Sequence, residues 1–351
     1  MTQHPSPLAP MARFTGRVAT GLLDVTDDPA ALDSEGFWAV VADFEGRFTC
    51  ARFADMRPEA EHPADPGGWC GPDRTAWHSS LDRAAYTAGV RRIREYIAEG
   101  EVYQANLCRV LRAALPDPDR CDVDALTARL ALGNPAPFAG TVRLPGHGVE
   151  VATASPELFL ERHGDTVGSG PIKGTGRTED DLLEKDFAEN VMIVDLVRND
   201  LGRVCATGSV TVPDLCAVEK HPGLVHLVST VEGRLREEAG WPGLMAATFP
   251  PGSVTGAPKS SALRIIEALE TAPRGPYCGA VGWVDADRGE ARLAVGIRTF
   301  WLDRTDPSAP QVCFGTGAGI TWGSDPEGEW AETELKAARL LAVASGPELD
   351  T

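Results

Sequence analysis

The sequence predicts an α+β fold. Strand-like runs and helical patterns are interspersed along the chain, without the regular strand–helix alternation of a doubly wound sheet. The chain has 351 residues, of which 43% are hydrophobic and 24% are charged, an ordinary composition for a folded domain. A chain of this length can bury a large core.

The chain is strongly acidic, with 33 Lys and Arg against 51 Asp and Glu and a formal net charge of −18. This balance argues against non-specific binding of nucleic acid, because a polyanion would be repelled. An anionic substrate would need local positive charge inside the acidic shell. The 8 cysteines include no CxxC pair and no zinc spacing, so we expect reduced, mostly buried thiols in a cytoplasmic protein.

We divide the chain into a short, divergent N-terminal region, 1–76, and a larger domain, 77–351. In the first region, strand-like runs at 37–42 and 48–53 are separated by turn signals. The stretch 54–76 is rich in Pro, Gly and Asp and is the predicted linker. The first residues lack the apolar run of a secretory signal.

The larger domain opens with a predicted helix that begins at Ser80, carries apolar residues at helical spacing and stops at Gly100. A long helix is predicted over 179–199, capped by Thr178, and its second half is apolar all round and should be buried. Carboxylates on such a helix are costly unless they are paired or bound to metal. Further helices are expected at 122–132 and 325–343, and strands at 140–144, 149–154, 158–162, 166–168, 208–212, 224–232, 279–284, 292–300 and 312–315.

Two glycine-rich segments resemble nucleotide-binding loops, and each lacks a required residue. GTGAGI at 315–320 has Ile where a dinucleotide fingerprint needs its third Gly, and GSVTGAPKS at 252–260 has Pro where a phosphate loop needs Gly before Lys. Both can expose backbone N–H groups to a carboxylate, with tight turns alone as an equal alternative. The second lies in the uncharged stretch 239–258, whose prolines and glycines exclude a membrane-spanning helix.

Two pairs of carboxylates share one spacing on two predicted helices. Asp186 and Glu189 are three residues apart on the buried helix, and Glu329 and Glu332 repeat this spacing on the last helix. In isolation the second pair would indicate a solvated face, with Glu332 paired to Lys336. If the two helices face each other, the pairs could clamp Mg²⁺, which prefers oxygen ligands and retains water and substrate oxygens.

Three further residues are candidates for nucleophilic or acid–base roles. Lys173, in the segment PIKGT, would become nucleophilic if a cavity desolvated its amine, although a lone lysine is usually solvated. Glu157 and His226 are acid–base candidates, and a structural role is favoured for each of them in isolation. Candidate donors for anionic groups are Tyr277, Lys259 and Arg298.

The order of several segments along the chain identifies a family. The segments are EYIAEGEVYQANL (95–107), ASPELFL (154–160), PIKGT (171–175), AENVMIVDLVRNDLGR (188–203), HLVST (226–230), GSVTGAPK (252–259), GIRT (296–299), GAGI (317–320) and EWAET (329–333). Together they resemble the chorismate-utilising enzymes, most closely the synthase subunits that form aminodeoxychorismate. The resemblance implies the chorismate-binding fold of anthranilate synthases, with two β-sheets packed face to face and helices outside.

The resemblance also implies a Mg²⁺ cofactor and a dianionic substrate, chorismate. Glu189 and Glu332 would bind the metal directly, and Glu329 and Asp186 would support it. The metal would hold the ring carboxylate of chorismate, which answers the charge requirement of the acidic shell. The substrate-binding residues implied for the remainder of the molecule are Ser253, Tyr277, Arg298, Gly317, Ala318, Gly319 and Lys336.

The subfamily depends on Lys173, because anthranilate synthases carry Ala at this position. By resemblance, the amine of Lys173 would attack C2 of chorismate while Glu157 protonates the departing 4-hydroxyl, with His226 beside the ring. Ammonia would then add at C4 and expel the lysine, giving 4-amino-4-deoxychorismate for 4-aminobenzoate and folate biosynthesis. No Cys stands in a Gly-Cys-Gly setting, so a separate glutamine amidotransferase subunit would supply the ammonia.

Other outcomes are open at this stage. Within the family, the alternatives are synthesis of anthranilate or isochorismate, or formation of aminodeoxychorismate for a secondary metabolite. A non-catalytic binding subunit that has kept the fold is a further alternative, which the intact set of Lys173, Glu157, Glu189 and Glu332 disfavours.

Overall fold

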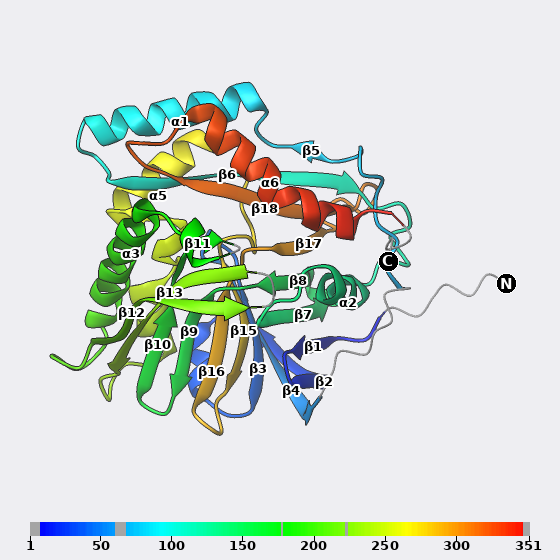
Figure 1. Ribbon diagram of the computed structural model, residues 1–351. Coiled ribbons are helices and arrows are strands. Elements are labelled where there is room, and N and C mark those ends of the chain that lie inside the picture. Colours follow the sequence, from blue (N-terminus) through cyan, green and yellow to red (C-terminus); the bar gives the residue numbers. More distant parts are fainter. Residues whose placement is uncertain (1–7, 60–67, 177, 222–223, 347–351) are drawn as a thin grey trace.

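The computed structural model describes residues 8–59, 68–176, 178–221 and 224–346 (Figure 1). The helices are α1 (Arg83–Ala98), α2 (Val123–Gly133), α3 (Glu184–Gly202), α4 (Trp241–Thr248), α5 (Lys259–Leu269) and α6 (Pro326–Ala344). The strands are β1 (Met11–Phe14), β2 (Arg17–Thr26), β3 (Phe37–Ala42), β4 (Phe48–Pro58), β5 (His78–Ser79), β6 (Gln104–Ala114), β7 (Phe138–Leu144), β8 (Val149–Ser155), β9 (Leu158–His163), β10 (Thr166–Gly170), β11 (Ile172–Gly176), β12 (Thr211–His221), β13 (Leu224–Arg234), β14 (Gly256–Ala257), β15 (Ala280–Asp285), β16 (Glu290–Val295), β17 (Thr299–Asp303) and β18 (Gln311–Ile320).

The described strands form one continuous antiparallel ribbon with two halves. The first half runs in the order β12, β13, β10, β9, β16, β15 and β3, and β11 also pairs with β13. The second half runs in the order β7, β8, β17, β18 and β6. Strands β4, β2 and β1 join the two halves. The predicted α+β class, with packed sheets and outer helices, is confirmed.

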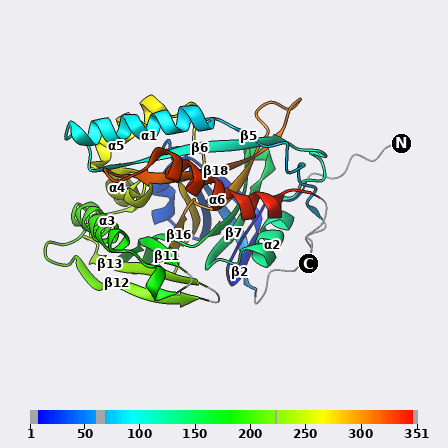
Figure 2. The same cartoon turned by 45° about the horizontal axis from the view of Figure 1, so that its top comes forward.

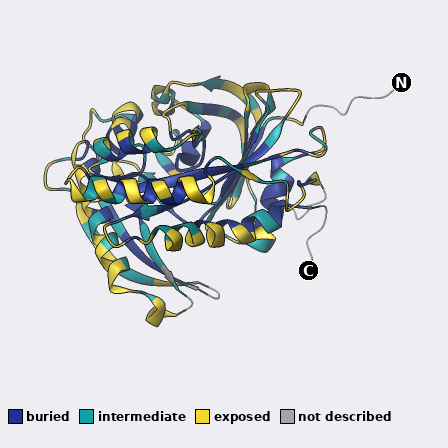
Figure 3. Cartoon of the chain, turned by 90° about the horizontal axis from the view of Figure 1, so that it is seen from above, coloured by how far each residue is buried: buried dark blue, intermediate teal, exposed yellow. Residues whose placement is uncertain are grey.

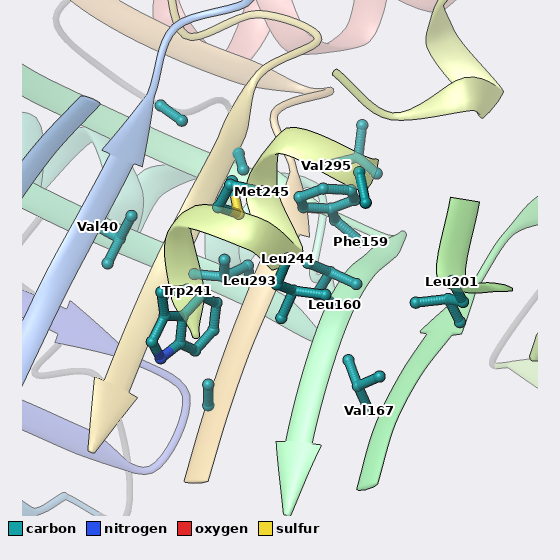
Figure 4. Close-up of a cluster of buried hydrophobic side chains, with 14 of the residues drawn as sticks. Val40, Phe159, Leu160, Val167, Leu201, Trp241, Leu244, Met245, Leu293 and Val295 are labelled. Atoms are coloured by element: carbon teal, nitrogen blue, oxygen red, sulfur yellow. The ribbon is translucent and has the colours of Figure 1, made fainter. Parts of the chain in front are cut away.

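Apolar side chains explain how the ribbon packs. Val142 and Val151 of the second half share a buried cluster with Val41 and Val281 of the first, so the two halves bury these faces against each other. Helices cover the outer faces, and they expose their outward sides while the strands beneath are buried (Figure 3). On the first half, Trp241, Leu244 and Met245 of α4 lie over the side chains of Phe159, Leu160 and Leu293 (Figure 4).

The N-terminal strands take part in the same ribbon. β3 pairs with β15 and β1 pairs with β7, so residues 11–58 complete the sheet. The predicted linker 54–76 overlaps the end of β4, and residues 60–67 lie outside the described part of the chain. Trp69 is 2% exposed, and its Nε1–H donates to the carbonyl of Ala344 at 2.9 Å. Among the described residues, no helix combines the length and the apolar composition needed to cross a membrane.

Several predicted boundaries differ from the structure, and two of the differences have clear local reasons. The long helix α3 begins at Glu184, because residues 179–181 form a separate 3₁₀ turn that Thr178 precedes. The single strand predicted over 292–300 is interrupted between β16 and β17, where Arg298 adopts the left-handed φ of 52°. A strand cannot continue through that conformation, so Arg298 occupies a bend between two strands.

A buried ion pair fastens the loop after α5 to the sheet. The Arg274 and Glu270 side chains lie 2.6 Å apart and are 1% and 7% exposed. Arg274 also donates to the carbonyls of Val254 at 2.9 Å and Asn106 at 3.1 Å, and Glu270 accepts from the Cys108 N–H at 2.8 Å. One guanidinium therefore connects β6, the 252–254 turn and the end of α5.

We predict that Arg274→Met lowers the free energy of unfolding by about 3–5 kcal/mol, because it leaves the Glu270 carboxylate buried and unpaired. Urea denaturation followed by circular dichroism measures this change. Arg198→Met is the matched control, since both side chains of its ion pair with Asp195 are more than half exposed, at 52% and 65%, and it should cost no more than about 1 kcal/mol. Equal shifts for the two variants would contradict this role of Arg274.

Candidate active site

Glu157 lies in the two-residue connection between β8 and β9. Its carbonyl accepts a hydrogen bond from the Val295 N–H at 3.0 Å, and its N–H donates to Ser155 Oγ at 3.2 Å. The residue is 5% exposed. These backbone contacts fix the carboxyl group at the place where two neighbouring strands end.

The environment of Glu157 suits an acid. Burial raises the pKa of this carboxyl group from 4.5 to about 7, against the opposing effects of a hydrogen bond from Ser253, the positive charge of Lys173 and the Ile172 N–H. Near neutral pH the group therefore exists in both protonation states. A carboxylic acid tuned in this way can donate a proton to a leaving group.

Lys173 projects from β11, a strand that pairs with β13 and places Lys173 opposite Leu227. The pairing shifts register after Lys173, and Gly174 has the left-handed φ of 72°. A Cβ on Gly174 would lie 3.0 Å from Asp186 Cβ, so glycine allows α3 to pack closely on β11. Figure 2 shows β11 between α3 and α6. The half-buried lysine is close enough to lower the pKa values of both Glu157 and Glu189.

The two carboxylate pairs come together from α3 and α6. Burial raises the pKa of Glu189, and the negative charges of Asp186 and Glu332 raise it further. Burial likewise raises the pKa of Glu329, with Glu332 again adding to the shift and a Ser324 hydrogen bond opposing it. Glu189 and Glu332 thus repel one another across the space between the helices.

The carboxylates of α3 and α6 supply oxygen atoms, the type of ligand that a hard divalent cation takes. Lys336 partly balances the charge, because its Nζ lies 2.6 Å from Glu332 and donates to the Gly317 carbonyl at 3.2 Å. Within the described ranges, no group of three or more His, Cys, Asp or Glu side chains is arranged to hold a metal ion. Mg²⁺ commonly takes one or two protein carboxylates and completes its shell with water and substrate oxygens, so the two helices supply a suitable partial site.

Arg298 is placed to receive an anion. Burial lowers the pKa of its guanidinium, and within the described part of the chain no carboxylate forms an ion pair with it. Its backbone carbonyl accepts from the Ala154 N–H at 3.0 Å, which fixes the bend between β16 and β17. A desolvated guanidinium without a counter-ion favours binding of a carboxylate.

Alternate glycines leave one face of β18 without side chains. A Cβ on Gly315 would overlap the Tyr277 ring, and a Cβ on Gly317 would overlap Cys108 Sγ. A Cβ on Gly319 would likewise overlap Gln104 Nε2. The opposite face carries Ala318, which is buried against the helices. The glycines therefore allow polar and aromatic groups to approach the backbone. Residues 315–320 were predicted to form a glycine-rich loop or tight turns, but they belong to the strand β18, and binding of a carboxylate by this segment stays a prediction.

The structure places the other predicted residues as follows. Ser253 is 7% exposed and its hydroxyl hydrogen-bonds to Glu157. His226 is 5% exposed and lies on β13 opposite Thr175. Lys259 was expected to be a donor for anions, but its Nζ is already bonded to Asp200 at 2.7 Å and to the Thr248 carbonyl at 2.9 Å. Lys259 therefore stabilises the fold through these contacts, and Arg298 is the better candidate for binding an anion.

Gln104 is a buried polar residue that the sequence reasoning did not single out. It is fully buried, and its Oε1 has no hydrogen-bond partner among the described residues. Its Nε2 donates to Asn106 Oδ1 at 3.3 Å. The only signal for it was its place in the segment 95–107, because a glutamine has no chemistry distinctive enough to single it out.

Comparisons with known proteins are consistent with this geometry. Residues 56–342 match the family model described as chorismate binding enzyme. Anthranilate synthase component 1 1 of Haloarcula marismortui is 41% identical over 282 residues, covering 77% of this chain and 55% of that protein. Aminodeoxychorismate synthase of Streptomyces pristinaespiralis is 42% identical over 282 residues, covering 76% of this chain and 37% of that protein.

Aminodeoxychorismate synthase component 1 of Salmonella typhimurium is 36% identical, covering 76% of this chain and 59% of that protein. The chain thus spans about half the length of the curated relatives it matches. Among solved structures, anthranilate synthase component I of Streptococcus pneumoniae superposes with a TM-score of 0.74 at 22% identity, covering 97% of this chain and 95% of that one. The menaquinone-specific isochorismate synthase of Escherichia coli gives a TM-score of 0.76 at 18% identity, covering 97% and 90%. These two likenesses show the fold.

The raised pKa of Glu157 predicts a pH-dependent contribution to stability. Folding favours the protonated form, so this contribution is complete below pH 4.5 and is lost as the pH rises through about 7. Relative to Glu157→Gln, which stays neutral, the wild-type free energy of unfolding should fall by roughly 3 kcal/mol over this range.

Urea denaturation of both proteins at several pH values measures the difference. The control is Glu237→Gln, which removes an exposed carboxylate and should give a difference that hardly changes with pH. A flat difference for Glu157→Gln as well would show that Glu157 titrates like an ordinary surface carboxylate.

Proposed function

The chain belongs to the chorismate-binding enzyme family, and from this premise we propose that it aminates chorismate at C4 in a Mg²⁺-dependent reaction that yields 4-amino-4-deoxychorismate. The observation that carries the proposal is the position of Lys173, whose charge acts on both Glu157 and Glu189. An amine between a buried acid and the candidate metal carboxylates is placed to attack a ring that the metal and Arg298 would hold.

Binding follows from the charges around the site. Chorismate carries two carboxylates, and the site offers two separate places for them. Arg298, desolvated and without an ion-pair partner in the described ranges, would hold the enolpyruvyl carboxylate beside Tyr277 and the glycine face of β18. When bound between Glu189 and Glu332, Mg²⁺ would supply positive charge for the ring carboxylate. The ring would then lie between α6 and the start of β9.

The proposed chemistry uses two displacements. After losing its proton to solvent, the amine of Lys173 forms a bond to C2 as the ring double bond shifts and the bond from C4 to its hydroxyl group breaks. Glu157 gives its proton to that hydroxyl, which leaves as water. Ammonia then forms a bond to C4, the double bond shifts back and the lysine leaves C2. Two allylic displacements therefore place nitrogen at C4 and restore the free lysine.

The nitrogen source is also part of the proposal. We propose that ammonia comes from a separate glutamine amidotransferase subunit, and that the product serves 4-aminobenzoate and folate synthesis. Anthranilate synthesis is the second candidate, favoured by the 41% identity to an anthranilate synthase component. In that reaction ammonia would add directly at C2, and Lys173 would have no covalent role.

Product identification separates the two candidates. With chorismate, ammonium and Mg²⁺, we expect the protein to form 4-amino-4-deoxychorismate, identified by chromatography and mass spectrometry. Lys173→Ala should lower its formation by more than about 100-fold, because the variant loses the covalent step. Lys220→Ala, whose lysine side chain is 73% exposed, should behave as wild type. Anthranilate as the wild-type product, or a normal para product from Lys173→Ala, would overturn the proposal.

The metal proposal predicts a change in Mg²⁺ dependence. Glu332→Gln removes one charged ligand, so half-maximal activity should need a Mg²⁺ concentration at least about 10-fold higher. Initial rates measured against Mg²⁺ at saturating chorismate test this. Glu327→Gln, on the same helix with its carboxylate 51% exposed, is the control. An unchanged Mg²⁺ titration for Glu332→Gln would exclude Glu332 as a ligand.

A further inference from the structure

A small internal cavity connects Glu157 with a residue that the proposed chemistry does not use. The cavity has a volume of about 20 Å³, and its wall includes both Glu157 and Asp200. Ser169, Thr248 and Ser253 also line it, and all five residues are at most 7% exposed. A cavity of this size, lined by several polar groups, is large enough for an ordered water that could bridge them.

Asp200 forms the far end of this arrangement together with Lys259. Asp200 lies near the end of α3, and Lys259 is the first residue of α5. The Lys259 Nζ lies 2.7 Å from Asp200 Oδ2 and also donates to the Thr248 carbonyl at 2.9 Å. The two side chains are 11% and 19% exposed, so the pair keeps contact with solvent. It therefore stands between bulk water and the cavity.

Glu157 needs such a connection if it acts as proposed. Each turnover leaves it as a carboxylate, because its proton departs with the hydroxyl group as water. The carboxylate is buried, and a bound ring would cover the side of it that faces the substrate. A proton must return before the next turnover, and the incoming ammonia releases one to solvent after it bonds to C4.

We propose that Asp200 returns this proton to Glu157 through water in the cavity, an inference that rests on the proposed function. A solvent proton binds the Asp200 carboxylate, passes to the cavity water as that water gives a proton to Glu157, and leaves Asp200 ionised again beside Lys259. No bond other than O–H bonds forms or breaks. Asp200 thus acts through Glu157 and does not touch the substrate.

The electrostatics of Asp200 agree with this role. Burial raises the pKa of Asp200, while the charge of Lys259 and hydrogen bonds from Lys259 and Asn199 oppose the rise. Lys259 keeps the carboxylate charged at rest, and desolvation makes a transient proton less costly. A surface aspartate is fully solvated, so protonating it would not be made easier in this way.

The test is steady-state amination of chorismate with saturating ammonium and Mg²⁺. Asp200→Asn keeps the shape and an acceptor for Lys259 but cannot carry the proton. We expect kcat to fall at least about 10-fold, with KM for chorismate unchanged, and to recover as imidazole buffer is raised at constant pH and ionic strength. Asp195→Asn, a 65% exposed carboxylate on the same helix, should keep the wild-type kcat without a buffer effect.

A second variant keeps the inference testable if Asp200→Asn folds poorly. Ser169→Val fills the cavity without changing charge, and it should lower kcat at unchanged KM while the thermal midpoint stays near that of wild type. Folded variants with wild-type kcat, or a loss in Asp200→Asn that imidazole does not relieve, would overturn the route. If wild type leaves chorismate unconsumed, the proposed function fails and the route fails with it; if wild type is active and the variants match it, the route alone fails.

Discussion

The candidate site depends on one electrostatic arrangement, the placement of Lys173 close to two carboxylates that water does not fully solvate. Glu157 and Glu189 would both be destabilised by burial alone, and the lysine offsets part of that cost for each. Removing the lysine charge would raise the pKa values of both carboxyl groups. The same electrostatic interactions therefore affect both the proposed chemistry and the local stability.

The antiparallel ribbon supplies this arrangement by ending several strands at one place. Glu157 lies where β8 gives way to β9, and Arg298 lies at the bend between β16 and β17. Behind them, the buried guanidinium of Arg274 connects the 252–254 turn with β6, which fixes the segment that carries Ser253. Close packing of α3 on β11 requires glycine at 174. These contacts fix the part of the site that the sheet carries, and Glu332 lies close enough to Glu189 to raise its pKa.

Local sequence signals predicted much of the fold, but they did not predict β6 or α5. Helices α1, α2 and α6 follow from apolar spacing and their flanking Asp, Gly and Pro residues. β6 was missed because it carries Arg109 and Arg112 among its apolar residues, although Arg109 is 2% exposed and stacks on Trp330. α5 was missed because its first turn overlaps the glycine-rich segment. For β6 a tertiary contact decides the structure, whereas α5 carries Ala262, Ile265 and Ile266 at helical spacing, so its pattern was present in the sequence.

The site shows the same division. Motif order pointed to Lys173, Glu157 and Arg298, and the structure gives each of them a distinctive environment. Sequence spacing indicated that the carboxylates of α3 and α6 form pairs, but only the fold brings residues 189 and 332 near one another. The sequence also did not distinguish the environment of Lys259 from that of Arg298, because each is a cation that follows a glycine-containing segment. One is neutralised by Asp200, and the other lacks an ion-pair partner within the described part of the chain.

The central claim is that the amine on β11 reaches the ring of a bound substrate. A crystal structure of the protein with Mg²⁺ and an unreactive analogue of chorismate measures this directly. The account predicts that Lys173 Nζ lies within about 3.5 Å of ring carbon C2, with the Glu157 carboxyl group at the 4-hydroxyl. An amine directed into bulk solvent, with the ring bound elsewhere, would contradict the account.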